Sequence, residues 1–209
     1  MLDNDHCIHY NINKRYICTE GRPNMYLQCS TAKTANQQKL FENALISLMQ
    51  SEDFEKISVV DICERASITR RIFYRLFETK YDCLVAAIDH KMMESELYQS
   101  KEGRNGFSQI LEYIMVEKDF FVALAKGNHM GLFMERLLAY MDSEHSRAKQ
   151  LMGIFSDEAR ELLIYNISGF IGVIFYWIDT DFACSIEQMA IILTKIMRRQ
   201  YSESAASSL

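Results

Sequence analysis

The chain contains very few of the residues that form turns, and this scarcity constrains its fold more than any other feature. Only eight of its 209 residues are glycine, and only one, Pro23, is proline. Folds built from β-strands need a turn after about every eight to twelve residues, usually with glycine or proline in it. Hydrophobic residues make up 49% of the sequence, which is enough for a sizeable core. We therefore predict an all-α fold.

Hydrophobic periodicity predicts four helices in the first half of the chain. Apolar residues spaced by three and four positions, such as Phe41 and Leu45, indicate the first of them. Ser58, Thr69 and Thr79 are suited to cap the next three, because serine and threonine hydroxyls accept hydrogen bonds from the first N–H groups of a helix. The expected ranges are 34–51, 58–66, 69–77 and 79–98.

The spacing of these helices is typical of a helix-turn-helix unit, in which two short helices flank a three-residue turn and a longer helix precedes them. The predicted motif covers residues 58–77. The net charge of −5 argues against binding of polyanions by the whole surface. Residues 65–80, in contrast, carry five basic side chains and one acidic side chain. This charge asymmetry favours a local site for a nucleic acid.

The predicted third helix separates its polar and aromatic side chains. Four polar side chains share one side: Arg70, Arg71, Tyr74 and Arg75. Phe73 and Phe77 share the opposite side and are expected to pack inward. Arginine can bridge O6 and N7 of guanine in the major groove, while Thr69 and Lys80 are placed to contact phosphates. Surface ion pairs with Glu64 and Glu78 are the alternative role for these cations.

The segment SVVDICERASITRRIFYRLFETKYDCLVAAI, residues 58–88, resembles the TetR/AcrR family of transcriptional regulators. Tyr74, Phe77 and Lys80 occupy positions of the family pattern, and the resemblance extends over residues 34–90. The sequence differs from that pattern at Ser67, where the family usually has glycine, and at Arg71, where many relatives have a small residue. Ser67 can adopt a left-handed turn conformation at a modest cost.

The resemblance implies a set of DNA-contacting residues: Thr34, Ser58, Thr69, Arg70, Arg71, Tyr74, Arg75 and Lys80. Residues 169–193 are also similar to the C-terminal domain of a subgroup that includes activators of dihydroxyacetone kinase operons. Activation and repression of transcription therefore both remain open.

The second half of the chain is also predicted to be helical. Two helices are expected to meet near Glu117, and further helices follow over 130–143, 157–178 and from a cap at Ser185 to Gln200. Residues 162–178 are uncharged, but acidic residues flank them and Asn166 lies inside them, so we do not expect a transmembrane span. We expect this helix to be buried in its own domain and across a homodimer interface. The resemblance implies such an interface, with these candidates: Ser168, Gly169, Gly172, Phe175, Tyr176 and Ile191.

Regulators of this family often bind a small effector in the C-terminal domain. Six aromatic residues are candidates for the lining of such a pocket: Phe107, Tyr113, Phe121, Phe133, Tyr140 and Tyr165. An ordinary hydrophobic core explains the same residues, and a protein can take the place of the small-molecule effector.

The sequence carries no pattern of an enzyme, such as a glycine-rich phosphate loop or a His-x-x-x-His metal pair. We expect no cofactor and no metal, because Cys7, His9, Cys18 and Cys29 lack the paired spacing of zinc ligands. The six cysteines are expected to be reduced in a cytoplasmic protein, since no secretory signal is evident.

We expect four parts along the chain: an N-terminal arm over 1–32, a helix-turn-helix domain over 33–90, a helical regulatory and dimerisation domain over 91–200, and a flexible tail over 201–209. The predicted function is that of a dimeric, sequence-specific regulator of transcription that binds double-stranded DNA and no membrane. The alternative is a partner-dependent co-regulator, or interaction module, without direct DNA binding.

Overall fold

A computed structural model describes residues 31–101, 107–142 and 160–206. These residues form helices and no strands, so the predicted all-α fold is confirmed. The elements follow one another along the chain as α1 (Ala32–Met49), the 3₁₀-helix η2 (Phe54–Lys56), α2 (Val59–Ala66), α3 (Arg70–Leu76), α4 (Lys80–Lys101), α5 (Phe107–Val116), α6 (Lys118–Lys126), α7 (Met130–Asp142), α9 (Arg160–Asp179) and α10 (Ile186–Ala206).

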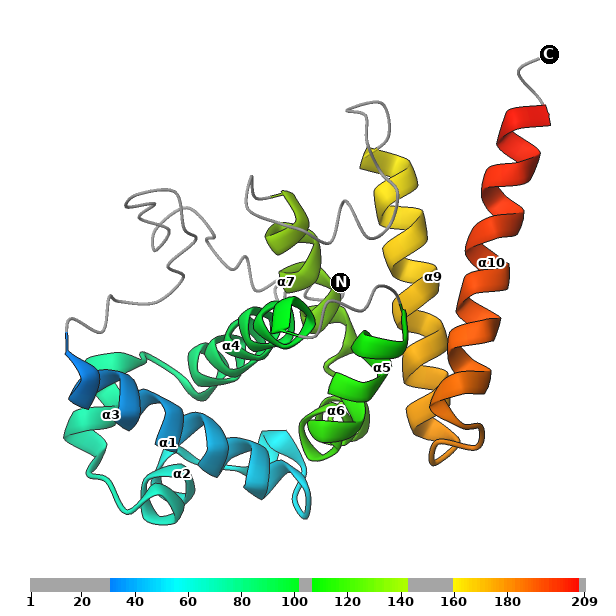
Figure 1. The fold of residues 1–209 in the computed structure, drawn as a ribbon. Helices are drawn as coiled ribbons and strands as arrows, with labels where there is room; N and C mark the ends of the chain where they lie inside the picture. The colour runs from blue at the N-terminus through cyan, green and yellow to red at the C-terminus, as the bar shows by residue number, and fades with distance from the viewer. Residues whose placement is uncertain (1–30, 102–106, 143–159, 207–209) are drawn as a thin grey trace, which may run out of the picture.

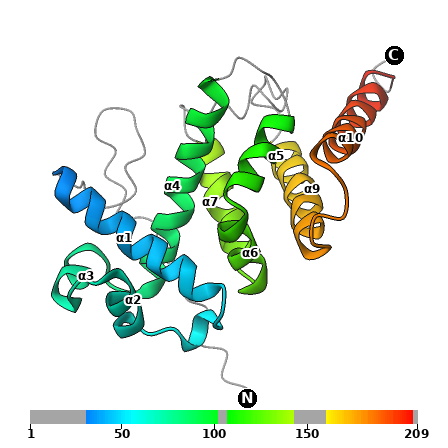
Figure 2. The same cartoon turned by 60° about the horizontal axis from the view of Figure 1, so that its bottom comes forward.

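The helices form two groups that α4 connects (Figures 1 and 2). We call α1, η2, α2 and α3 the head, and α5, α6, α7, α9 and α10 the body. Both views place α3 at one end of the molecule and α10 at the other. Helix α4 packs on α1 of the head and on α5 and α7 of the body. Any movement of the head relative to the body therefore involves α4.

Most predicted helix boundaries agree with the structure, because they depend on local capping. The N–H group of Asp82 donates to Thr79 Oγ1 over 3.2 Å, and Asp82 Oδ2 accepts from the N–H group of Thr79 over 2.9 Å. Helix α1 begins earlier than predicted, since Thr31 caps it by accepting from the N–H group of Thr34 at 3.2 Å.

Helix α10 ends later than predicted. It continues to Ala206, through the first six residues of the predicted flexible tail, because residues 201–206 contain neither glycine nor proline. The predicted arm lies outside the described residues except for Thr31 and Ala32, as do Cys7, His9, Cys18 and Cys29. The domain boundaries at 33, 90 and 200 remain predictions.

One apolar core runs through both groups of helices. Leu84 and Ile88 of α4 are fully buried and join the side chains of the head to those of the body. A buried ion pair also fixes α4 to α7: Arg136 Nε donates to Asp89 Oδ1 over 2.9 Å and Nη2 to Oδ2 over 3.1 Å. Two parallel hydrogen bonds are the favoured geometry for an arginine and a carboxylate, and they compensate both buried charges.

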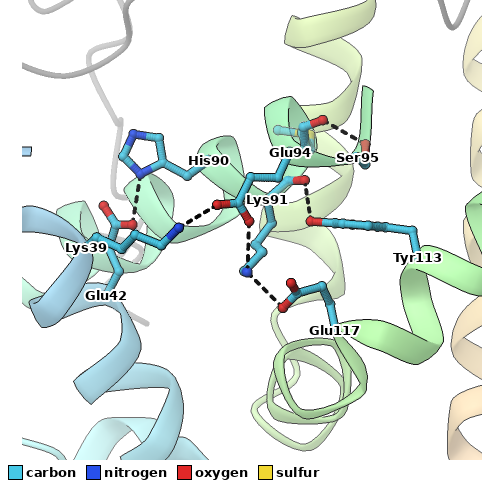
Figure 3. Close-up of polar contacts among 9 residues, drawn as sticks. Lys39, Glu42, His90, Lys91, Glu94, Ser95, Tyr113 and Glu117 are labelled. Atoms are coloured by element: carbon cyan, nitrogen blue, oxygen red, sulfur yellow. Dashed lines mark hydrogen bonds and ion pairs between the residues drawn. The ribbon is translucent and has the colours of Figure 1, made fainter. Parts of the chain in front are cut away.

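A chain of ion pairs connects α1 to the start of α6 across α4 (Figure 3). Lys39 of α1 donates to Glu94 of α4 over 2.8 Å, and Lys91 donates to the same carboxylate over 2.9 Å. Lys91 also forms an ion pair with Glu117, the residue that precedes α6, over 2.7 Å. The hydroxyl group of Tyr113 in α5 also donates to the main-chain carbonyl of Lys91, over 2.8 Å. The head is thus connected to the body by charges as well as by apolar packing.

A second polar contact between α1 and α4 is sensitive to pH. His90 Nδ1 lies 2.8 Å from Oε2 of Glu42, whose side chain is only 5% exposed. The hydrogen bond with Glu42 raises the pKa of His90 above its ordinary value of 6.5, and burial works against this effect. The charges of Glu42, Asp89 and Glu94 raise the pKa further.

We expect this contact to stabilise the fold more in mild acid than in mild base. Because the pKa of His90 is higher in the folded chain than in the unfolded chain, its contribution is complete below about pH 6.5 and is lost as the pH rises through the folded-state value. The His90→Gln variant should therefore lose more free energy of unfolding, relative to the wild type, at about pH 6 than at about pH 8.5. Urea denaturation at both pH values measures this difference, and an equal loss at both values would contradict the assignment.

Candidate nucleic-acid interface

The turn between α2 and α3 has the geometry that the sequence predicted. Helix α2 begins with a capping box in which Ser58 Oγ accepts from the N–H group of Asp61 and Asp61 Oδ2 accepts from the N–H group of Ser58. After the helix, Ser67 adopts φ 55° and ψ 38°, the left-handed conformation that glycine usually supplies. The N–H group of Ile68 then donates to the carbonyl of Cys63 over 3.0 Å, which closes the turn.

Helix α3 is held by its aromatic side. Phe73 and Phe77 are buried, and their ring centroids lie 5.2 Å and 6.3 Å from that of Phe41 in α1. These phenylalanines are 5.3 Å from each other. Edge-on aromatic contacts of this kind stabilise a core beyond their buried area alone. The predicted separation of the two sides of α3 is confirmed.

The outward side of α3 presents its polar residues to solvent. Arg70, Arg71 and Arg75 are exposed, and the side chain of Tyr74 is 58% exposed. Neither Arg70 nor Arg71 forms an ion pair with another residue in the described ranges, so pairing with Glu64 or Glu78 does not explain them there. Both remain available to an anionic partner.

Arg75 is held by a neighbouring helix. Its Nη2 donates to Oε1 of Gln37 in α1 over 3.0 Å. Gln37 lies one turn after Thr34, so this hydrogen bond places the start of α1 beside the end of α3. Arg65 of α2 makes a similar contact with Ser47 of α1 over 3.3 Å. Gln37 and Ser47 were not among the predicted residues, because nothing in the local spacing relates them to arginines in other helices.

The remaining predicted DNA contacts lie at helix starts. Thr34 lies in the first turn of α1, where its hydroxyl oxygen is 2.8 Å from that of Thr31. Thr69 precedes α3 as predicted and is exposed, but its side chain forms no capping hydrogen bond, so the expected hydroxyl cap is wrong. Ser58 uses its hydroxyl group in the capping box of α2. The structure thus leaves Thr69 open to an anion beside Arg70.

Lys80 has a different environment from the arginines. Its Nζ donates to three main-chain carbonyls in the segment before α2, those of Phe54, Glu55 and Ile57, and its side chain is only 16% exposed. We therefore leave Lys80 out of the direct phosphate contacts.

Three of the predicted effector-pocket residues pack together in the body, and a fourth contacts a different ring. Phe121 lies 6.4 Å from Tyr113 and 5.8 Å from Phe133, measured between ring centroids, and Phe107 stacks on Phe170 at 5.5 Å. Tyr165 does not join them, because it lies on the outer side of α9 and is 64% exposed. The side chain of Tyr140 lies outside the described part of the structure.

The predicted dimer residues of α9 lie mostly on its uncovered side. Ser168, Gly169 and Gly172 are exposed, and a Cβ atom added at either glycine would meet no other atom within 4 Å. Tyr176 is 69% exposed beside them, and Ile191 of α10 is 53% exposed. Phe175 is different: it is buried against Phe133 in its own chain, with 6.2 Å between the rings.

The helical periodicity of α9 explains the correction for Phe175. The side that faces the body carries Ile167, Ile171, Ile174, Phe175 and Ile178, all buried. Among the residues that the structure describes, none covers the opposite side. We call this uncovered surface of α9, with the exposed isoleucines of α10, the outer apolar face: Ile164, Tyr165, Ser168, Gly169, Gly172, Tyr176, Ile191, Ile192 and Ile196. Within the described ranges, no helix is both long and apolar enough to cross a bilayer.

Comparison with known proteins relates this fold to regulators of transcription. Residues 102–199 match the family TetR_C_8, described as a transcriptional regulator C-terminal region. No curated protein matches the chain.

Three solved structures have the same fold, each with low sequence identity. A TetR transcriptional regulator from Streptococcus agalactiae 2603V is 20% identical, with a TM-score of 0.59 over 79% of this chain and 95% of that one. The dihydroxyacetone kinase operon activator DhaS is also 20% identical, with a TM-score of 0.54 over 78% and 95%. A tetR-family transcriptional regulator from Streptomyces coelicolor is 16% identical, with a TM-score of 0.55 over 81% and 84%.

These likenesses agree with the family, and with the subgroup, that the helix-turn-helix sequence and residues 169–193 indicated. The chain thus has the fold of TetR-family transcriptional regulators and its residues 102–199 match the model of a transcriptional regulator C-terminal region, so the resemblance to the TetR family is confirmed.

Proposed function

We propose that the protein is a dimeric regulator of transcription that binds a specific sequence of double-stranded DNA through α3. The observation that carries the proposal is the outward side of α3, where Arg70, Arg71 and Tyr74 are exposed on a helix-turn-helix unit braced by α1. A DNA-binding regulator acts where the DNA is, so the expected cytoplasmic location belongs to this proposal. It assigns no catalytic activity.

The chemistry of this side suits the major groove. A guanidinium group can donate two hydrogen bonds to O6 and N7 of guanine, and each such pair discriminates against a wrong base by about 1–3 kcal/mol. The exposed Thr69 and the first N–H groups of α3 are placed to hold a phosphate. Helix α3 contains three arginines and no acidic residue, so its whole outward side attracts the DNA backbone.

A second copy of the chain is the proposed occupant of the outer apolar face. Small residues at 168, 169 and 172 allow another helix to approach closely, and the exposed aromatic and aliphatic side chains around them supply area to bury. A two-fold dimer presents two recognition helices to half-sites about 34 Å apart, one turn of the double helix.

Control by a small effector or by a partner protein, acting on the C-terminal part, belongs to the same proposal. An effector can change DNA binding only if it binds one arrangement of the heads more tightly than the other. The alternative function, a partner-dependent co-regulator without DNA contact of its own, predicts that the arginines of α3 are dispensable. The two functions are therefore separated by a binding experiment on variants of α3.

We expect the wild-type protein to select duplexes from a library of genomic fragments and to bind them with an affinity that falls steeply as salt rises. The Arg70→Ala/Arg71→Ala variant should lose about 30-fold or more in affinity, since it removes two candidate base contacts. Fluorescence anisotropy over a salt series measures both effects.

The Lys118→Ala/Lys126→Ala variant is the matched control, because it removes two positive charges from α6 in the body. It should bind the selected duplex like the wild type. Selection of no duplex by the wild type, or equal binding by the arginine variant, would instead favour the partner-dependent alternative.

We expect the Gly172→Arg variant to be monomeric. Its fold should be retained, because a Cβ atom added at this position meets no atom of another described element within 4 Å. The long charged side chain would, however, keep a second α9 at a distance. Sedimentation velocity or light scattering after gel filtration measures the change.

Gly131→Arg is the control for this substitution. Gly131 is also an exposed helical glycine with no atom within 4 Å of an added Cβ, but it lies on α7, away from the outer apolar face. This control should remain a dimer. A dimeric Gly172→Arg variant would place the interface elsewhere.

A further inference from the structure

Lys80 lies at the point where the two ends of the helix-turn-helix segment come together. It is the first residue of α4, directly after the segment that contains α3. Its Nζ reaches back to η2 and donates to the carbonyls of Phe54 over 2.7 Å, Glu55 over 3.0 Å and Ile57 over 3.0 Å. The Lys80 ammonium group therefore joins the segment that precedes residues 58–77 to the helix that follows them.

Lys80 supplies a donor to carbonyls at the end of a helical turn. The last carbonyls of a helical turn have no N–H partner within the turn, and a lysine side chain is a favourable substitute. The carbonyl of Phe54 also accepts from the N–H group of Ile57 over 3.2 Å, so Lys80 is its second donor. The hydrogen bond from Lys80 to the Ile57 carbonyl lies in a partly buried region, where the loss of a donor is costly. The same Nζ lies 4.6 Å from the centroid of the Phe54 ring, a cation–π distance.

Neighbouring contacts hold the two flanks in place. The hydroxyl group of Tyr81, the next residue of α4, donates to the carboxylate of Glu55. The ring of Phe54 packs against that of Tyr81 at 4.8 Å and against that of His129, in the body, at 4.6 Å. The segment before α2 is thus fixed to the start of α4 and to the body, with the Lys80 ammonium group at its centre.

We propose that Lys80 is a positioning residue for the recognition helix, which joins the segment 54–57 to the start of α4, and not a contact to DNA phosphate. The proposal rests on the function proposed above, because the role of Lys80 is to hold α3 in the position in which it binds DNA. Its Nζ has three hydrogen-bond acceptors within the chain and its side chain is 16% exposed, unlike the exposed Arg70 and Arg71. A move toward a phosphate would leave the three carbonyls without this donor.

The Lys80→Met variant tests the proposal, because it keeps an unbranched apolar chain as long as the aliphatic part of lysine and removes the ammonium group. Two controls accompany it. Lys56→Met removes the same charge from an exposed residue of η2, and Arg71→Met removes a candidate direct contact on α3. Anisotropy titrations use the duplex that the wild type selects and a scrambled duplex, over a salt series. Circular dichroism first establishes a temperature at which every variant is fully folded.

Positioning predicts that Lys80→Met binds the selected duplex about tenfold or more weakly, while its binding to the scrambled duplex and its salt dependence stay those of the wild type. Hydrogen exchange should become faster in residues 54–57 and 70–76 and stay unchanged in α9. Lys56→Met should match the wild type. Arg71→Met should lower the slope of log affinity against log salt or lose discrimination between the duplexes, with exchange unchanged.

Two results overturn the proposal. A phosphate contact would weaken both duplexes alike and lower the salt slope by about 0.9, as expected for one lost phosphate. A purely structural role would lower the melting temperature but leave the affinity of the folded variant unchanged. If the wild type binds no duplex, the proposed function fails. In that case hydrogen exchange still tests whether Lys80 joins residues 54–57 to α4. Unchanged exchange of residues 54–57 in the Lys80→Met variant would show that it does not.

Discussion

The packing of α3 on α1 is the contact on which the rest of the candidate interface depends. A helix of seven residues is unstable by itself, because too few hydrogen bonds follow the costly first turn. Phe73 and Phe77 supply the missing stability by burying their rings against Phe41. The same contact fixes the rotation of α3 about its axis, so the packing that stabilises the helix also decides that Arg70 and Arg71 face outward.

Burial divides the cationic side chains of the protein into two groups. Lys80, Lys91 and Arg136 lie at least partly inside, where an uncompensated charge is costly, and each has carbonyl or carboxylate acceptors. Arg70 and Arg71 remain in solvent and form no ion pair within the described ranges. The inward cations connect elements of the fold, and the outward arginines are the ones suited to an external anion. The role of a cation therefore follows from its environment more closely than from its place in a motif.

The predictions that failed concern helices whose apolar pattern was identified correctly but whose orientation toward the core was not. The periodicity of α9 identified an apolar helix, yet Phe175 and Tyr165 both lie on the side opposite to the expected one. An apolar helix can turn either side toward its own domain, and only the neighbouring helices decide which side that is. The predicted end of α10 was wrong for a related reason. Polar residues without glycine or proline are found both in helices and in coil, so the local sequence does not fix where the helix ends.

Local sequence was enough to predict the helices, the capping boxes at Ser58 and Ser185, and the two sides of α3. These features depend on residues within about five positions of one another, where helical geometry is the same in every protein. Only the tertiary structure decided the acceptors of Lys80, the hydrogen bond of Arg75 with Gln37 and the ion pairs that join head to body. The partners in these contacts lie between 23 and 55 positions apart in the sequence, apart from Lys91 and Glu94 on a single helix. Such contacts depend on the path of the whole chain, and no local spacing encodes that path.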